Sequence, residues 1–320
     1  MLFVLGGMML AGLTACSGDD DTATNDNAPQ TADDGVKVRR LTITEADDGA
    51  AEARQALTRA SLTENGGLTA KWTAGDKLTY CNLMRMQKNG EEDVPVSGNL
   101  KATTTAATSQ FTGDVVCDAG DYLAVVYPAT TFETNESYTI SLSGQDGTLA
   151  TLATRYHYVF GKARVTAVAD KTADATMPKM KSLLTVCKFS FVDKETNEAI
   201  PVNSLSISYG GIGSDVGTYP QTATVAIGAN TEQADVHATG AAGSSEALTI
   251  NCPTAQTAVY VALLPTAKQR TFSFTVSGGS GSTYTGTAKG SGSTYTGTAK
   301  ATLAEGEYVA ATGLRLTKQQ

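Results

Sequence analysis

Short runs of alternating apolar and polar residues recur along most of this chain, and turn residues separate them. Residues 138–142 (Tyr-Thr-Ile-Ser-Leu) alternate cleanly, whereas residues 122–127 are almost entirely apolar. Alternation is typical of a strand with one buried face, and a short apolar run is typical of a strand covered on both faces. From residue 60 onward the pattern therefore predicts an all-β protein.

Two series of such runs are separated by a polar stretch at residues 169–178. A chain of 320 residues has room for two ordinary domains. The spacing of the runs is typical of β-sandwiches, so we predict one sandwich over residues 60–172 and a second over 173–320. Residues 145–164 are the hardest to assign, and we expect a loop with one helical turn before a strand.

The residues before position 60 form an arm of different composition. Residues 17–35 offer almost nothing to bury, which predicts disorder. Residues 36–44 are the one apolar stretch of the arm and predict a strand, and residues 45–56 fit either a loop or a weak helix. The apolar residues of the predicted strand are Val36, Val38, Leu41 and Ile43.

Charge is distributed unevenly between this arm and the rest of the chain. Residues 1–59 hold ten Asp or Glu against five Lys or Arg, so most of the net charge of −8 belongs to the arm. A surface for nucleic acid would instead gather Lys and Arg. The composition therefore excludes nucleic acid as a partner.

The first fifteen residues form a short apolar run that ends in Leu13-Thr-Ala-Cys16. The run is too short to span a bilayer and predicts a signal peptide over residues 1–15. Leu-Thr-Ala-Cys resembles a bacterial lipobox, although a basic segment before the apolar run is missing. The resemblance implies cleavage before Cys16 and lipid attachment, with palmitate, to its sulfur. An ordinary secretory signal with an incidental cysteine is the alternative.

The acidic residues that follow Cys16 have two readings. Asp19, Asp20 and Asp21 resemble the tag that sends some lipoproteins to the outer face of the outer membrane. They also fit the start of a solvated tether.

Residue types that carry chemistry are sparse and scattered. The two histidines, His157 and His237, lie in unrelated contexts, and no Gly-x-Ser-x-Gly motif accompanies them. The cysteine spacing matches no zinc motif and no dense disulfide framework, so we predict no enzyme, no metal and no cofactor. Disulfide pairing stays open for Cys81, Cys117, Cys187 and Cys252.

Residues 279–320 contain a repeat and a final strand. Residues 279–289 recur unchanged as residues 290–300, which indicates a tandem duplication that lengthens a surface hairpin. Residues 307–318 alternate and predict the last strand. On one face of that strand lie Tyr308, Ala310, Leu314 and Leu316.

Several short motifs, taken in order, resemble the fimbrillin-like subunits of type V fimbriae, which are exported as outer-membrane lipoproteins. They are the lipobox at Cys16, Thr58-Arg59-Ala60, residues 68–78 (Leu-Thr-Ala-Lys-Trp-Thr-Ala-Gly-Asp-Lys-Leu), residues 122–128, residues 145–149 (Gln-Asp-Gly-Thr-Leu), residues 259–265 (Val-Tyr-Val-Ala-Leu-Leu-Pro) and residues 303–308 (Leu-Ala-Glu-Gly-Glu-Tyr). The resemblance implies two tandem β-sandwich domains, of Greek-key, transthyretin-like type, behind a lipidated and mostly disordered arm.

The resemblance also implies a maturation step. A trypsin-like, Arg-specific protease would cut the arm at the Arg59–Ala60 bond, with Arg54 as the rival position, and so remove the strand at residues 36–44. An uncut surface arginine is the alternative reading of Arg59. Loss of the strand would leave an apolar groove with unpaired backbone groups.

A strand of the next subunit would fill that groove, and the final strand at residues 307–318 is the donor candidate. Such a contact runs head to tail, does not close on itself and makes a filament. The implied protein is a pilin that serves adhesion, with other fimbrial subunits as partners. Two other roles stay open: a tethered surface lipoprotein that binds glycan or host protein, and an accessory, tip or anchor subunit of a fimbrium.

Overall fold

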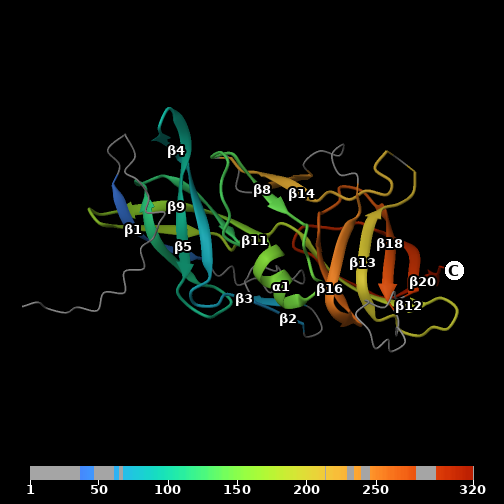
Figure 1. Ribbon diagram of the computed structural model, residues 1–320. Coiled ribbons are helices and arrows are strands. Elements are labelled where there is room, and N and C mark those ends of the chain that lie inside the picture. Colours follow the sequence, from blue (N-terminus) through green and yellow to red (C-terminus); the bar gives the residue numbers. More distant parts are fainter. Residues whose placement is uncertain are drawn as a thin grey trace, which may run out of the picture.

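The computed structural model of the protein describes residues 37–46, 61–64, 68–212, 214–228, 234–238, 246–278 and 293–319. Over these residues the fold is all-β, as predicted, and its strands form four sheets (Figure 1). The helical exception is the predicted turn near residue 150, which is confirmed: α1 (Leu149–Thr151) and the π-helical turn η1 (Leu152–Tyr156) precede a strand. The Thr148 side chain caps α1 by accepting a hydrogen bond from the Thr151 N–H.

The first sheet closes on itself. Its strands follow the order β10 (Thr172–Met177), β1 (Val38–Glu45), β6 (Gln110–Val116), β5 (Glu92–Ala102), β4 (Lys77–Asn89), β7 (Tyr122–Tyr127), β9 (Val159–Val168) and β11 (Lys181–Ser182). Because β10 also pairs with β9, the strands from β10 round to β9 form a continuous barrel-like ring. The arm therefore contributes one strand, β1, to the wall of this ring.

The interior of the ring is filled by large apolar side chains. Trp72, which precedes β4, is fully buried in this interior and makes edge-on ring contacts with Phe111 and Tyr127, at 5.0 and 5.5 Å between centroids. Such perpendicular pairs are the favoured geometry of aromatic rings. The cluster around them also includes Leu41 and Ile43 of β1.

The second large sheet is built from the C-terminal half of the chain. Its order is β16 (Leu248–Gln256), β13 (Val202–Tyr209), β18 (Arg270–Gly278), β19 (Ser293–Ala301), β20 (Tyr308–Lys318), β12 (Thr185–Asp193) and β17 (Val259–Leu263). The second copy of the sequence repeat forms β19, which pairs with β18 as an antiparallel hairpin. The first copy lies outside the described residues.

Two small sheets lie beside the large ones. One has the order β15 (Asp235–Ala238), β14 (Thr222–Ala226) and β8 (Ser137–Ser141), and the other pairs β2 (Ser61–Glu64) with β3 (Leu68–Lys71). β8 comes from the first predicted domain and β14 from the second, and β10 lies across the predicted boundary at 172/173 while pairing within the first sheet. One apolar cluster also contains residues from both halves of the chain.

Candidate functional site

β1 occupies a slot between β6 and β10. It runs antiparallel to β6, from the pair Val38–Val116 to the pair Thr44–Gln110, and parallel to β10 from Arg40–Thr172 to Glu45–Met177. Both edges of the strand are thus hydrogen-bonded along most of its length. If β1 were removed, β6 and β10 would face each other with unpaired N–H and C=O groups.

The inner face of β1 fills the barrel. Leu41 and Ile43 are 0% exposed, whereas Val38, at the beginning of the strand, is 36% exposed. Burying side chains of this size stabilises the fold by about 1.5–3 kcal/mol each. The predicted apolar residue Val36 lies outside the described part of the chain.

A buried carboxylate ends the inner row of β1. Glu45 is 5% exposed, and its oxygens accept hydrogen bonds from Trp72 Nε1 at 3.3 Å and from the backbone N–H groups of Ser109 at 3.3 Å and Met180 at 3.1 Å. Sequence reasoning missed this residue, because Glu45 stood at the edge of the acidic spacer. The alternation with Leu41 and Ile43 was the available signal. The slot therefore has a cluster of hydrogen-bond donors at this end.

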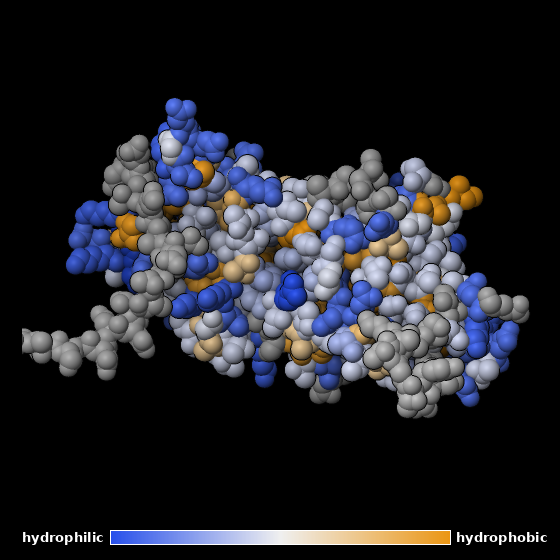
Figure 2. All heavy atoms as spheres, in the orientation of Figure 1, coloured by the Kyte–Doolittle hydropathy of each residue, from blue (hydrophilic) through white to orange (hydrophobic). Residues whose placement is uncertain are grey.

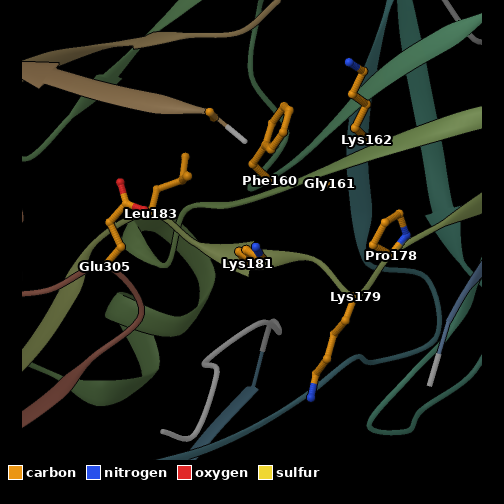
Figure 3. Close-up of a pocket in the computed structure, with 9 residues that line it drawn as sticks. Phe160, Gly161, Lys162, Pro178, Lys179, Lys181, Leu183 and Glu305 are labelled. Atoms are coloured by element: carbon orange, nitrogen blue, oxygen red, sulfur yellow. The ribbon is translucent and has the colours of Figure 1, made fainter. Parts of the chain in front are cut away.

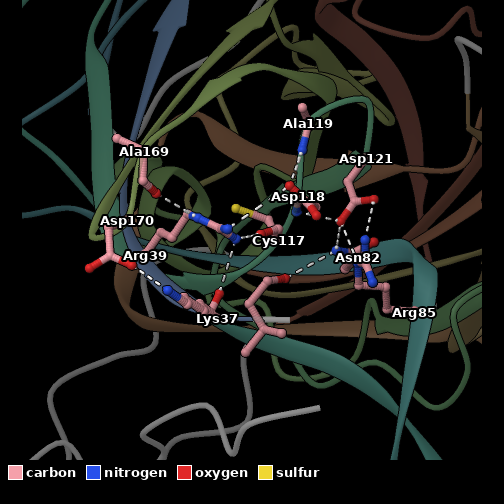
Figure 4. Close-up of polar contacts among 11 residues, drawn as sticks. Lys37, Arg39, Asn82, Arg85, Cys117, Asp118, Ala119, Asp121, Ala169 and Asp170 are labelled. Atoms are coloured by element: carbon pink, nitrogen blue, oxygen red, sulfur yellow. Dashed lines mark hydrogen bonds and ion pairs between the residues drawn. The ribbon is translucent and has the colours of Figure 1, made fainter. Parts of the chain in front are cut away.

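The opposite end of the inner row carries a cation. The side chain of Arg39 is 11% exposed; its guanidinium donates to the backbone carbonyls of Ala169 at 2.9 Å and of Cys117, and it lies 4.0 Å from Asp118 Oδ1. Figure 4 shows these contacts, together with the ion pair between Lys37 and Asp170 on the same side. Carbonyls and carboxylates thus surround the slot at this end.

The turn that supplies Cys117 and Asp118 is held by a polar network. Asp121 Oδ2 accepts from the Asp118 N–H at 2.9 Å and from Asn82 Nδ2 at 2.9 Å, and it forms an ion pair with Arg85 (Figure 4). Ion pairs and hydrogen bonds of this kind are strongest when water is excluded, as it is around buried Asn82 and Asp121. The acceptor end of the slot is therefore firmly positioned.

The predicted donor strand, β20, is paired within its own chain. It runs parallel to β12 and pairs with β19 through two residue pairs, Tyr295–Lys318 and Thr296–Thr317. Figure 1 places the C-terminal end and β1 at opposite ends of the molecule. Deleting residues 307–320 would therefore disrupt the second sheet, so it is no clean test of a donor role.

The prediction that Tyr308, Ala310, Leu314 and Leu316 share one face of β20 is wrong. The register with β12 shifts between Phe189 and Phe191, and Gly313 adopts φ +66°, a left-handed conformation that glycine accepts without strain. The bulge moves the inward row by one residue: Ala311 lies inward before it and Leu314 after it. Ala310 is exposed, although the sequence placed it with Tyr308, Leu314 and Leu316.

A second carboxylate joins β2 to the second sheet. Glu64 Oε1 accepts from Tyr308 at 2.7 Å, Oε2 accepts from Tyr260 at 2.5 Å, and Lys188 Nζ lies 2.8 Å from both oxygens. These hydrogen bonds, led by the one from Lys188, lower the pKa of Glu64 to about 2. β2 begins at Ser61, just after the predicted cleavage bond, so this cluster holds the residues that follow that bond.

A surface depression lies where the two halves of the chain meet. Its lining includes Phe160 and Gly161 of β9, Leu183, and Glu305 (Figure 3). Burial raises the pKa of Glu305. Three lysines also line it, and Figure 3 shows Lys179 pointing away from Glu305. No Ser, Thr, Cys or His is among these lining residues.

Exposed apolar side chains do not form one continuous patch on the face shown in Figure 2, where hydrophobic residues are scattered among polar ones. Single exposed apolar residues are normal on soluble proteins. The large ones among the described residues are Val38, Met84, Met86, Ile212 and Val216. A broad apolar docking face is therefore not evident on this side.

The four described cysteines are free thiols, so the open question of their pairing is answered for this structure. Burial raises the pKa of Cys81 to about 12 and those of Cys117 and Cys252 to about 11, and it raises the pKa of Cys187 as well. Thiols of this kind are poor nucleophiles at neutral pH. They pack as small apolar side chains.

Other predicted positions lie outside the described residues: Cys16, Arg54, Arg59 and Ala60. Within the described ranges, no three or more His, Cys, Asp or Glu residues come together as a metal site. The same part of the chain contains no helix that is long and apolar enough to cross a membrane.

Comparison with known proteins gives a distant likeness. No family model and no curated protein matches the chain. Among solved structures, it is similar to a candidate cell adhesion protein of Bacteroides uniformis ATCC 8492, with 16% identity, 78% of this chain and 81% of that chain covered, and a TM-score of 0.43. It is also similar to a candidate cell adhesion protein of Bacteroides ovatus ATCC 8483. That likeness has 10% identity, covers 89% of this chain and 97% of that chain, and has a TM-score of 0.47.

A further similar structure is the shaft pilin SpaA of Lactobacillus rhamnosus GG, with 12% identity, 89% of this chain and 98% of that chain covered, and a TM-score of 0.31. At these identities and TM-scores, the likenesses assign the chain to no family.

Proposed function

We propose that this chain is a pilin subunit, exported as an outer-membrane lipoprotein through Cys16, that matures by loss of β1 and polymerises when a strand of another subunit takes its place. The observation that carries the proposal is the position of β1. This strand of the arm completes the first sheet, with β6 on one side and β10 on the other. Its inward residues Leu41 and Ile43 are part of the barrel core.

The connection between β1 and the rest of the chain suits such a maturation. The predicted cleavage positions, Arg59 and its rival Arg54, lie between β1 and β2, so one cut there separates β1 from the body of the chain. The remaining arginines of the arm, Arg39 and Arg40, lie within a strand that is paired on both sides and is a poor protease substrate. An Arg-specific, trypsin-like protease would therefore cut between the two strands.

The β2–β3 hairpin, which follows the cleavage site, would stay attached to the second sheet after that cut. Glu64 of β2 is held by Lys188, Tyr260 and Tyr308, and these come from three strands of the second sheet. Cleavage would thus open the slot without releasing the β2–β3 hairpin. An open slot in each subunit and a strand offered by the next give a head-to-tail polymer at the cell surface, where it would serve adhesion.

The test is to treat the full chain with an Arg-specific protease and follow both the new N-terminus and the state of assembly. We expect N-terminal sequencing to begin at Ala60, and electron microscopy and gels to reveal polymers after cleavage. The double variant Arg54→Ala/Arg59→Ala, treated in the same way, should stay monomeric with β1 in place. Equal polymer from this variant would refute cleavage here as the trigger, and an uncut, tethered wild-type protein would favour the role of a surface binding lipoprotein.

A further inference from the structure

The two ends of the β1 slot differ in electrostatic character: one presents hydrogen-bond acceptors and the other presents donors. At the Arg39 end, the groups that face the inner row are the carbonyls of Ala169 and Cys117 and the carboxylate of Asp118. At the Glu45 end they are the N–H donors of Trp72, Ser109 and Met180. The inner row of β1 matches this arrangement in order: a cation, two apolar residues and an anion.

We propose that this polarity sets the direction of the incoming strand, and that β20 of a second copy enters the slot running opposite to β1. The inference rests on the proposed function, because it assumes that β1 is lost and replaced. It identifies the occupant as a second copy of this chain and adds the orientation and register with which that copy binds.

The residue order of β20 fits the slot in that direction. In a regular strand, alternate residues share a face, so once the bulge at Gly313 is straightened, one row holds Thr312, Leu314, Leu316 and Lys318. Entering opposite to β1, this row places Lys318 among the carbonyls and carboxylate around Arg39. Leu316 and Leu314 then take the two apolar positions of Leu41 and Ile43.

With β20 entering in this direction, the donors at the Glu45 end of the slot also meet an acceptor. Thr312 arrives at the position of Glu45, and its hydroxyl oxygen can accept a hydrogen bond from the donors that Glu45 now serves. The hydroxyl is shorter than the Glu45 side chain, so we expect it to satisfy fewer of the three donors. Each end of the slot nevertheless meets a group of the required kind.

Entry in the same direction as β1 fails at both ends. Leu314 and Leu316 would again fill the apolar positions, but Lys318 would arrive at the position of Glu45. Its ammonium group carries three donors and no acceptor, so it would confront the N–H groups of Trp72, Ser109 and Met180. Thr312 would meet the acceptor end without a charge to offer.

To enter the slot, β20 must leave its own sheet, where it lies between β19 and β12. Of its eleven residues, only Leu316 is buried, and its pairing with β19 extends over two residue pairs. It pairs with β12 through seven residue pairs, and the bulge divides them into a stretch of four and a stretch of three. The slot, in contrast, buries two apolar side chains of the strand completely.

Disulfide trapping distinguishes the two directions. In the proposed register, Thr317 takes the position of Arg40, opposite Thr172 of β10; in the other direction it takes the position of Thr44, opposite Thr176. These positions are about 13 Å apart along the strand, and a disulfide needs Cα atoms within about 7 Å. Because Thr172, Thr176 and Thr317 are all exposed threonines, the two double variants are matched.

The experiment uses full chains with Thr317→Cys combined with either Thr172→Cys or Thr176→Cys, which are cleaved, polymerised, oxidised and run on non-reducing gels. We expect a covalent ladder from the Thr172→Cys pair only, and no ladder from Thr317→Cys alone. A ladder from the Thr176→Cys pair only would overturn the direction and leave strand exchange standing. Polymers without either link would exclude β20 as the occupant, and the absence of polymer in every sample would refute the proposed function itself.

A charge variant provides an independent measurement. Lys318 is exposed in its own sheet, so its substitution leaves the monomer folded. We expect Lys318→Glu to slow polymerisation at least tenfold, because a carboxylate would face the carbonyls and Asp118, whereas Lys318→Arg should assemble at the wild-type rate. Unchanged assembly of Lys318→Glu would contradict the proposed direction.

Discussion

Two carboxylates illustrate what a single residue contributes to this protein. Glu45 is buried and satisfies three donors that come from separate segments: Trp72, Ser109 and Met180. Glu64 lies at the junction of β2 with the second sheet and binds a lysine and two tyrosines. The first fastens the arm to the barrel, and the second fastens the chain just beyond the predicted cleavage bond.

Replacing Glu45 by Leu should destabilise the uncut protein by about 3 kcal/mol, because buried donors then lose a charged acceptor. Glu45→Gln keeps one acceptor oxygen and should cost about 1 kcal/mol. Urea unfolding of the two variants and the wild type measures both values. Equal stability of Glu45→Leu and the wild type would mean that the carboxylate does not anchor β1.

Glu64 predicts a loss of stability in acid. Its pKa is lowered from 4.5 to about 2, so its contribution is fully present above about pH 4.5 and is lost as the pH falls toward 2. Glu64→Gln should therefore unfold with a weaker pH dependence than the wild type between pH 4.5 and 2. The exposed Glu133→Gln serves as the control and should follow the wild type.

At the scale of the element, β1 combines two functions in eight residues. Its backbone completes hydrogen bonding on both sides, and its alternate side chains extend into the core. A strand of this length that is paired on both edges is an integral part of a sheet. β1 is such a strand, even though it belongs to the acidic arm. β20 differs, because its bulge and its exposed residues leave it less firmly fixed.

Ile43→Ala should destabilise the uncut protein by about 2–5 kcal/mol, since it leaves a cavity in the barrel. Val38→Ala, in the same strand but 36% exposed, should change the free energy of unfolding by no more than about 0.5 kcal/mol. Chemical denaturation compares the two. Similar effects at both positions would mean that β1 does not pack as described.

At the scale of the whole molecule, the barrel with β1 in its wall lies at one end, and the second sheet with β20 lies at the other (Figure 1). In the proposed polymer, one copy would receive a strand at one end and offer its own at the other. Between them, the shared apolar cluster and the pairing of β8 with β14 join the two halves of the chain. Subunits built in this way would extend a filament instead of closing into a dimer.

Loss of β1 should be visible in amide hydrogen exchange. After cleavage of the protein and before polymerisation, β6 and β10 should exchange faster, because each loses a hydrogen-bonded neighbour. β7 keeps both of its neighbours, β4 and β9, and should be unchanged. Protection should return to β6 and β10 in the polymer, and persistent exposure there would contradict strand replacement.

The local pattern was sufficient for the type of structure but not for its pairing. Alternation predicted strands where β8 and β20 lie, the apolar stretch of the arm predicted β1, and the apolar run at residues 122–127 predicted buried β7. The helical turn before β9 was also predicted. The bulge in β20 was not predicted. A bulge depends on how a strand pairs with its neighbour, and one glycine among alternating residues does not reveal that pairing.

By itself, the sequence determined the all-β class, the segmentation into strands and the apolar residues of the arm, since side-chain alternation and turn chemistry act over a few neighbouring residues. Only the tertiary structure decided that β1 lies between β6 and β10, that Glu45 meets donors more than 130 residues away at Met180, and that β20 is bulged. These features depend on which distant segments meet, and that is settled by the packing of the whole chain.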